Sequence, residues 1–114
     1  LRRRGENISS FEVERAINMH PKILESAAVA VTSELAEDEV KICVVLKPGE
    51  TLSPKELIEH AADRIPYFAV PRYVEFLKSL PKTPTERVQK FQLRLAGITE
   101  KTWDRERAGI EIKR

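Results

Sequence analysis

Residues 27–31 read Ala-Ala-Val-Ala-Val, residues 40–46 read Val-Lys-Ile-Cys-Val-Val-Leu, and these two runs decide the fold. Short runs of small, β-branched and apolar residues are typical of β-strands that are buried on at least one face. We therefore predict strands over residues 24–32 and 40–46. The acidic residues at 34–39 predict the turn that joins them.

The segment before this strand pair has the pattern of a helix. Ser9 and Glu12 have the spacing of a capping box, and apolar residues follow at helical intervals. Pro21 disfavours helical backbone in the residue before it. A helix is therefore predicted over residues 10–20.

The segment after the strand pair carries the clearest helix signal in the chain. Ser53, Pro54 and Glu56 supply an N-cap, a proline at the first helical position and a capping-box glutamate. Pro66 predicts the end of this helix. Its apolar residues form one stripe, made of Leu57, Ile58, Ala61, Ala62 and Ile65.

The remaining segments complete an α+β order. Residues 71–77 alternate polar and apolar side chains, which predicts a third strand with one face in water. Residues 80–87 have loop chemistry, residues 90–95 are weakly helical, and the charged tail predicts a short helix or a loosely docked end. The expected fold is a two-layer sandwich in which helices pack on a small three-stranded or larger mixed sheet, preceded by an N-terminal hairpin.

Length, composition and charge exclude several classes of protein. The chain has 114 residues, 41% of them hydrophobic and 33% charged, which suits one domain and no membrane-spanning helix. A net charge of +2 gives no general field for nucleic acid. One cysteine points to a reducing compartment, and we expect the cytoplasm. The start at Leu1, with no methionine, predicts a fragment of a longer protein.

Few residues carry recognisable chemistry by themselves. The four glycines form no phosphate-binding cradle, so we expect no ATP to bind this fragment alone. His20 and His60 are given no role, and Cys43 is expected in the core. In two segments the choice of residue types goes beyond what folding requires. These are the basic residues 2–7 around a glycine and the proline-stiffened loop 83–87. Taken singly, each is better explained as a solvated surface turn.

Together these two segments resemble motifs of a known family. Residues 1–14, Leu-Arg-Arg-Arg-Gly-Glu-Asn-Ile-Ser-Ser-Phe-Glu-Val-Glu, are similar to the motif that opens the C-terminal domain of adenylate-forming acyl-CoA synthetases, the AMP-dependent synthetase/ligase family. Residues 80–94 resemble the closing motif of that domain. The segments 20–23, 48–53 and 71–74 also match. The residues of these motifs are most similar to those of crotonobetaine/carnitine-type or medium-chain ligases. The resemblance covers residues 1–95, so residues 96–114 are expected to form a separate charged tail.

The resemblance implies a two-step enzyme of fatty acid metabolism whose small domain rotates between steps. A carboxylate reacts with ATP to give an acyl-adenylate, and CoA then displaces AMP. ATP and CoA would be substrates, and Mg²⁺ would be needed in the complete enzyme. The partners are the missing N-terminal domain and a small carboxylic acid, and the fragment would be inactive alone. By this resemblance Arg4, Gly5, Phe68 and Arg72 contact CoA, and Arg87 occupies the position of the catalytic lysine.

The sequence departs from the family at the catalytic position. The family usually has Gly-Lys where this chain has Glu86-Arg87, and a guanidinium is a planar fork whereas an ammonium is a point charge. Lys82 or Lys90 is therefore kept as an alternative to Arg87. Two other functions remain open: a non-catalytic phosphate-binding or interaction module with this fold, and a domain of an adenylating enzyme that loads a carrier protein.

Overall fold

A four-stranded mixed sheet organises the chain, in a computed structural model that describes residues 2–3 and 5–112. The strand order is β3-β4-β5-β6. Their bounds are Ile23–Thr32 for β3, Asp38–Leu46 for β4, Tyr73–Phe76 for β5 and Trp103–Asp104 for β6. The mixed α+β class predicted from the sequence is confirmed.

The strands β3 and β4 form the predicted antiparallel hairpin, with Ala28 opposite Ile42. The strand β5 runs parallel to β4, because a helical crossover connects them. The predicted wet face of this third strand is wrong. Tyr73, Val74 and Glu75 are all buried, since the C-terminal segment and elements on both faces cover the strand.

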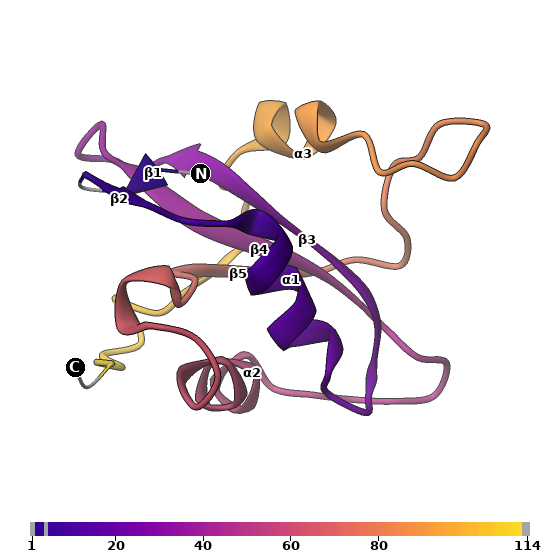
Figure 1. Cartoon of the computed structure of the whole chain (residues 1–114), viewed down its shortest axis with the longest axis horizontal. Helices are drawn as coiled ribbons and strands as arrows, with labels where there is room; N and C mark the ends of the chain where they lie inside the picture. Colours follow the sequence, from indigo (N-terminus) through magenta and orange to yellow (C-terminus); the bar gives the residue numbers. More distant parts are fainter. Residues whose placement is uncertain (1, 4, 113–114) are drawn as a thin grey trace.

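Two helices cover one face of the sheet (Figure 1). They are α1, Ser10–Asn18, and α2, Pro54–Ala62, and both are capped by the serines predicted from the sequence. The full capping box forms at Ser53, and α2 ends at Ala62, short of Pro66. A 3₁₀ turn, η1, follows at Tyr67–Ala69. The apolar faces of both helices pack on the sheet in the main core, whose buried members include Val13, Ile17, Ile42, Val44, Leu57, Ile58 and Val74.

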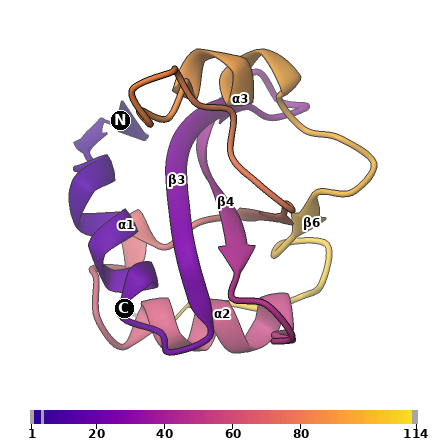
Figure 2. The same cartoon turned by 90° about the vertical axis from the view of Figure 1, so that its right-hand side faces the viewer.

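A third helix, α3, Lys90–Ala96, lies on the opposite face (Figure 2). Its Leu93 joins a second apolar cluster with Val29, Val31 and Val45. This helix forms a third, partial layer that the expected two-layer arrangement did not include. None of the helices among the described residues is long and apolar enough to cross a lipid bilayer.

The C-terminal segment is part of the sheet. Its strand β6 pairs with β5, and the Arg105 side chain is buried and donates a 3.1 Å hydrogen bond to the carbonyl of Pro71. Trp103 packs against the main core. The expected short helix or loosely docked end is therefore replaced by an edge strand and a series of turns.

Candidate functional site

The segment 81–89 forms a closed, projecting loop held by its own hydrogen bonds. The N–H of Thr83 donates to the carbonyl of Arg87 over 2.8 Å, and the N–H of Arg87 donates to the Thr83 hydroxyl over 3.1 Å. Lys82 and Val88 form an antiparallel bridge at its base, and the N–H of Gln89 donates to the Pro81 carbonyl. The loop is thus a defined platform for Arg87.

Glu86 and Arg87 stand at the tip of this loop. Glu86 has a φ of +66°, a left-handed conformation that favours glycine, which gives a physical reason for glycine at this position in the family. Arg87 is exposed, and within the part of the chain that the structure describes no carboxylate lies at ion-pair distance from its guanidinium. Its charge is therefore available to an external anion.

The two alternative cations are already engaged. Lys82 Nζ lies 3.0 Å from Glu25 Oε1 and 3.7 Å from Glu86 Oε2, and the hydrogen bond to Glu25 raises the pKa of Lys82. Lys90 Nζ lies 2.6 Å from Glu14 Oε2, joining the start of α3 to α1. Either would have to leave a carboxylate before acting on a ligand. The geometry therefore favours Arg87 of the three.

The predicted hairpin at the N-terminus is present. Strands β1, Arg2–Arg3, and β2, Glu6–Asn7, pair antiparallel around a turn that contains Gly5. Gly5 has a φ of +85°, and a Cβ added there would meet nothing within 4 Å. Glycine is needed for the backbone conformation, and its exposed surface is open to a partner. Arg4, predicted to contact CoA, lies outside the described residues.

Phe68 and Arg72 have different surroundings. Phe68 lies in η1, half-buried, with its ring edge-on to Tyr67 at a centroid distance of 5.7 Å, and it packs against the main core. Arg72 lies just before β5 and is only 5% exposed. Phe68 keeps part of its ring accessible to a ligand, whereas Arg72 is directed into the protein.

Carboxylates surround the Arg72 guanidinium. Its Nε and Nη2 donate to the two oxygens of Asp104 over 3.0 and 3.1 Å, and the guanidinium also reaches Glu39 at 3.4 Å and Glu34 at 3.3 Å. Burial alone would raise the pKa of Asp104, but the hydrogen bonds from Arg72 and the Glu106 N–H outweigh it and hold that pKa below its ordinary value. A phosphate would have to compete with these anions for Arg72.

Sequence reasoning missed this cluster and a second buried ion pair. Lys41 Nζ lies 2.8 Å from Glu75 Oε1, which also accepts hydrogen bonds from the hydroxyls of Thr99 and Thr102. The available signal was a set of charged residues, Glu39, Lys41 and Glu75, inside otherwise apolar strands. Glu39 pairs with Arg72, and Lys41 pairs with Glu75. The tail adds the hydroxyls of Thr99 and Thr102 to Glu75, and no local sequence pattern reports contacts at these separations.

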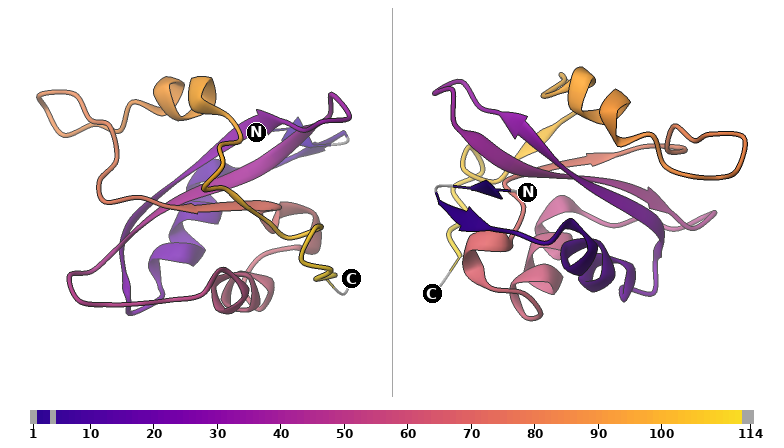
Figure 3. Two further views of the ribbon diagram at one scale, coloured as in Figure 1. Left: turned by 180° about the vertical axis from the view of Figure 1, so that it is seen from behind. Right: turned by 45° about the horizontal axis from the view of Figure 1, so that its top comes forward.

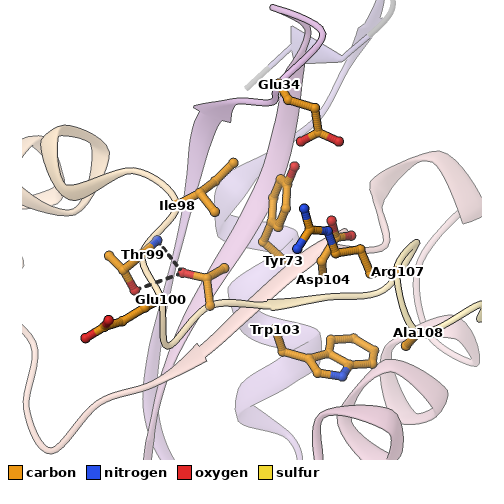
Figure 4. A pocket seen from close by; sticks show the side chains of 10 residues that line it. Glu34, Tyr73, Ile98, Thr99, Glu100, Trp103, Asp104, Arg107 and Ala108 are labelled. Carbon is orange, nitrogen blue, oxygen red and sulfur yellow. Dashed lines mark hydrogen bonds between the residues drawn. The ribbon is translucent and has the colours of Figure 1, made fainter.

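The tail also forms one wall of a cavity of about 430 Å³. Figure 4 shows Tyr73 at its centre, with Trp103 below it, Ile98 and Thr99 to one side and Asp104 and Arg107 to the other. Among the described residues, the Tyr73 hydroxyl has no hydrogen-bond partner. Carboxylates and the Arg107 guanidinium line the cavity together, so its charge favours no single class of ligand.

The predicted site residues fall into two groups at opposite ends of the domain. The N-terminal hairpin and η1 lie at one end in Figure 1, and the loop 81–89 projects from the other. The reverse view in Figure 3 shows the same separation. The fold therefore does not bring Arg87 together with Gly5 and Phe68, and each end is free to face a different surface.

Comparison with known proteins identifies the family. The AMP-binding enzyme C-terminal domain matches residues 12–87. The chain is 46% identical over 92 residues to the 2-methylpropanoate–CoA ligase CCL4 of Humulus lupulus, covering 79% of this chain and 16% of that protein. It is 39% identical over 92 residues to the mitochondrial medium-chain acyl-CoA ligase ACSF2 of Danio rerio, covering 81% and 15%.

A solved structure confirms the fold. The anthranilate CoA ligase AuaEII, in complex with anthranoyl-AMP, superposes with a TM-score of 0.81 at 30% identity, over 85% of this chain and 19% of that one. The chain spans about a sixth of the length of the curated relatives it matches. The family match covers most of α1, the strands β3, β4 and β5, helix α2 and the loop as far as Arg87. This chain therefore belongs to the AMP-binding enzyme C-terminal domain family.

Proposed function

We propose that this chain is the mobile C-terminal domain of an ATP-dependent acyl-CoA ligase. The observation that carries the proposal is Arg87: an exposed cation without an ion-pair partner among the described residues, held on a closed loop. By the sequence resemblance we assign it the position of the catalytic lysine. The separation of this loop from the Gly5 hairpin supports a domain that presents one end for each step. The fragment is inactive without the domain that binds ATP and the acid.

In the first step, an oxygen of the acid attacks the α-phosphorus of ATP. A bond forms between this oxygen and the α-phosphorus. The bond from the phosphorus to the bridging oxygen breaks, and that oxygen leaves with the electron pair as part of pyrophosphate. Negative charge builds up on the α-phosphate oxygens, and Arg87 stabilises that charge when the loop closes over the site. Because the loop is held by internal hydrogen bonds, little ordering is needed at closure.

In the second step, the thiol of CoA forms a bond to the acyl carbon, and the bond from that carbon to the AMP oxygen breaks. AMP leaves with the electron pair, and the thiol proton passes to water or to a base outside this domain. In this proposal Arg4 and the turn at Gly5 border the path of the pantetheine arm, and Phe68 contacts the nucleotide. Arg72 contacts the nucleotide only when its hydrogen bond to Asp104 or Glu34 breaks.

The proposed partners are the preceding large domain, ATP, CoA and a small carboxylic acid of fatty acid metabolism. The family implies Mg²⁺, but the described residues contain no group of three or more His, Cys, Asp or Glu side chains suited to it, and we assign the ion no step on this domain. We place the complete protein in the cytoplasm, in keeping with one buried, unpaired cysteine.

The test is ATP–pyrophosphate exchange by the complete protein over a panel of carboxylic acids. We expect Arg87→Ala to lower exchange by about 10²–10³-fold, the usual effect of removing one preorganised charge-stabilising group. Thioester formation from preformed acyl-adenylate should be retained. Lys55→Ala, which removes an exposed cation from α2, is the matched control and should change neither rate.

Other outcomes identify the alternatives. Unchanged exchange in Arg87→Ala would move the role to Lys82 or Lys90. Absence of exchange in the unmodified complete protein, with phosphate or partner binding retained, would indicate the non-catalytic module. Transfer of the acyl group to a carrier protein and not to CoA would indicate a carrier-loading enzyme.

A further inference from the structure

The loop that carries Arg87 has a paired lysine at each end. Lys82 lies at its base on the incoming side, and Lys90 follows the loop as the first residue of α3. The Nζ atom of Lys82 lies 3.0 Å from Glu25 Oε1. The Nζ atom of Lys90 lies 2.6 Å from Glu14 Oε2. Both ends of the loop are therefore connected to the rest of the domain by an ion pair.

Both ion pairs lead to the same strand. Glu25 belongs to β3, which is an edge strand of the four-stranded sheet. Glu14 belongs to α1, and the oxygen that meets Lys90 also accepts a 2.8 Å hydrogen bond from the N–H of Ala28 in β3. Figure 2 shows β3 in front, with α1 and α3 beside it. The strand β3 thus supports the loop at its two ends.

This support matters because the tip of the loop has little else to hold it. Residues 84–87 are exposed. The hydrogen bonds inside the loop fix its shape, but they do not fix its angle to the sheet. That angle depends on contacts at the base, which are the two ion pairs and the packing of Leu80 and Val88 in the second apolar cluster. A small rotation at the base displaces Arg87 at the tip.

Lys82 also controls the carboxylate next to Arg87. Its Nζ atom lies 3.7 Å from Glu86 Oε2, while its shorter contact is the one to Glu25. This pairing holds the Glu86 carboxylate near the base of the loop and away from an anion that Arg87 meets. Lys82 therefore has a structural use for its charge within the domain.

We propose that Glu14 and Glu25 are positioning residues for adenylation. By holding the lysines at the two ends of the loop, they set the angle at which the loop presents Arg87 to the reacting phosphate. This inference rests on the proposed function. Each carboxylate acts through its lysine, and neither touches a substrate. Lys82 and Lys90 are then anchors of the loop and not substitutes for Arg87.

The experiment uses the complete protein with Glu14→Gln, Glu25→Gln and both changes together. Glutamine removes the charge and keeps an oxygen that accepts from the Ala28 N–H. The paired side chains are 18–31% exposed, and such an ion pair changes an equilibrium by a factor of up to about five. Without it, a smaller fraction of the loops has the productive angle.

The kinetic constants should change selectively. We expect kcat of acid-dependent ATP–pyrophosphate exchange to fall about two- to fivefold in each single variant and about tenfold in the double variant. The KM for ATP should stay constant, because ATP binds to the large domain. Thioester formation from preformed acyl-adenylate should be retained. Glu59→Gln, which removes an exposed carboxylate from α2, is the matched control and should change neither half-reaction.

A double-mutant cycle separates an anchoring lysine from one that acts on the substrate. Glu25→Gln releases Lys82, so exchange would stay constant or rise if Lys82 itself met the phosphate. Anchoring predicts slower exchange. Lys82→Met removes the same ion pair, and combining it with Glu25→Gln should slow exchange no more than either change alone. A much larger loss in Lys82→Met than in Glu25→Gln would overturn the assignment of Lys82 as an anchor.

Three further results decide the proposal as a whole. Unchanged exchange in the Glu14→Gln, Glu25→Gln double variant, with an active unmodified protein, overturns the positioning role and leaves the proposed function standing. Equal loss of both half-reactions, with a lower midpoint of urea unfolding, also overturns it, because the ion pairs would then only support the fold. Absence of exchange in the unmodified protein overturns the proposed function itself, and the positioning role with it.

Discussion

The ion pair between Lys41 and Glu75 is the feature whose removal tests the structure most directly. Lys41 is 2% exposed, and its Nζ lies 2.8 Å from Glu75 Oε1 and 2.6 Å from the carbonyl oxygen of Gly97. The variant is Lys41→Met, because methionine retains an unbranched apolar stem and removes only the charge and the donors.

The expected loss follows from what remains around Glu75. In Lys41→Met the buried carboxylate keeps two donors, the hydroxyls of Thr99 and Thr102, and has no countercharge. Removing one partner of a buried pair costs about 3–5 kcal/mol. Because both threonine donors persist, we expect the free energy of unfolding to fall by the lower end of this range, about 3 kcal/mol. The total free energy of unfolding of a domain is about 5–15 kcal/mol.

Urea unfolding at pH 7 measures this difference. The companion variant adds Glu75→Gln, whose amide oxygen still accepts from the threonines but carries no charge. We expect the double variant to recover about 1–2 kcal/mol of the loss, since the buried uncompensated charge has gone. A loss below about 1 kcal/mol in Lys41→Met, or no recovery in the double variant, would refute the account of a tightly buried pair.

Acidification supplies an independent readout. Burial alone would raise the pKa of Glu75, but hydrogen bonds from Lys41, Thr102 and Thr99 hold it below its ordinary value. In the original chain this stabilisation is present above the unfolded-state pKa and is lost as the pH falls through the folded-state pKa. Without Lys41, burial dominates and the pKa rises, so protonation relieves the buried charge. The deficit of Lys41→Met should therefore shrink between pH 7 and pH 5, and a constant deficit would contradict the assignment.

Two further predictions concern single residues. Glu86→Gly should raise the free energy of unfolding by up to about 1 kcal/mol in urea denaturation, because glycine adopts the positive φ at that position without strain; a decrease would show that the side chain, which contacts Lys82, contributes more than the backbone. Burial and the nearby His60 lower the pKa of His20, whose Nδ1 accepts from the Lys22 N–H, so stability should fall as the pH drops from about 6.5 through the folded-state pKa. His20→Asn, which keeps an acceptor without titrating, should flatten that part of the pH profile, and an unchanged profile would assign the effect to another group.

Local chemistry made several elements predictable. The Ser53 capping box depends on residues within one turn, and it forms as the sequence indicates. The runs at 27–31 and 40–46 pair as a hairpin because their connecting turn is short. The order of these elements and the motifs at both ends were enough to recognise the family, which the comparisons confirm.

Other features depend on contacts between residues far apart in the chain. Alternation predicted a wet face for β5, but Glu75 is paired with Lys41, 34 residues away, and covered by Thr99 and Thr102. A charged residue in a strand is predicted to face water unless an oppositely charged partner is known. The sequence does not show that partner, because its position is set by the fold.

For the candidate site, the sequence identified Arg87 by motif and left Lys82 and Lys90 as alternatives. The structure distinguishes them by their neighbours, since each lysine is paired with a glutamate from another segment. In the same way it encloses Arg72 among carboxylates, whereas the family resemblance implied that Arg72 contacts CoA. The roles of these residues in catalysis stay predictions.

By itself the sequence determined the main helices and strands before the tail, their order and the family, because capping, hydrophobic periodicity and motifs depend on residues that are close together in the chain. Only the tertiary structure decided which charges are buried, which cation is exposed and which lysines are held by carboxylates. Those properties depend on what packs beside a residue, and the tail, through β6 and Asp104, supplies much of that packing from far along the chain.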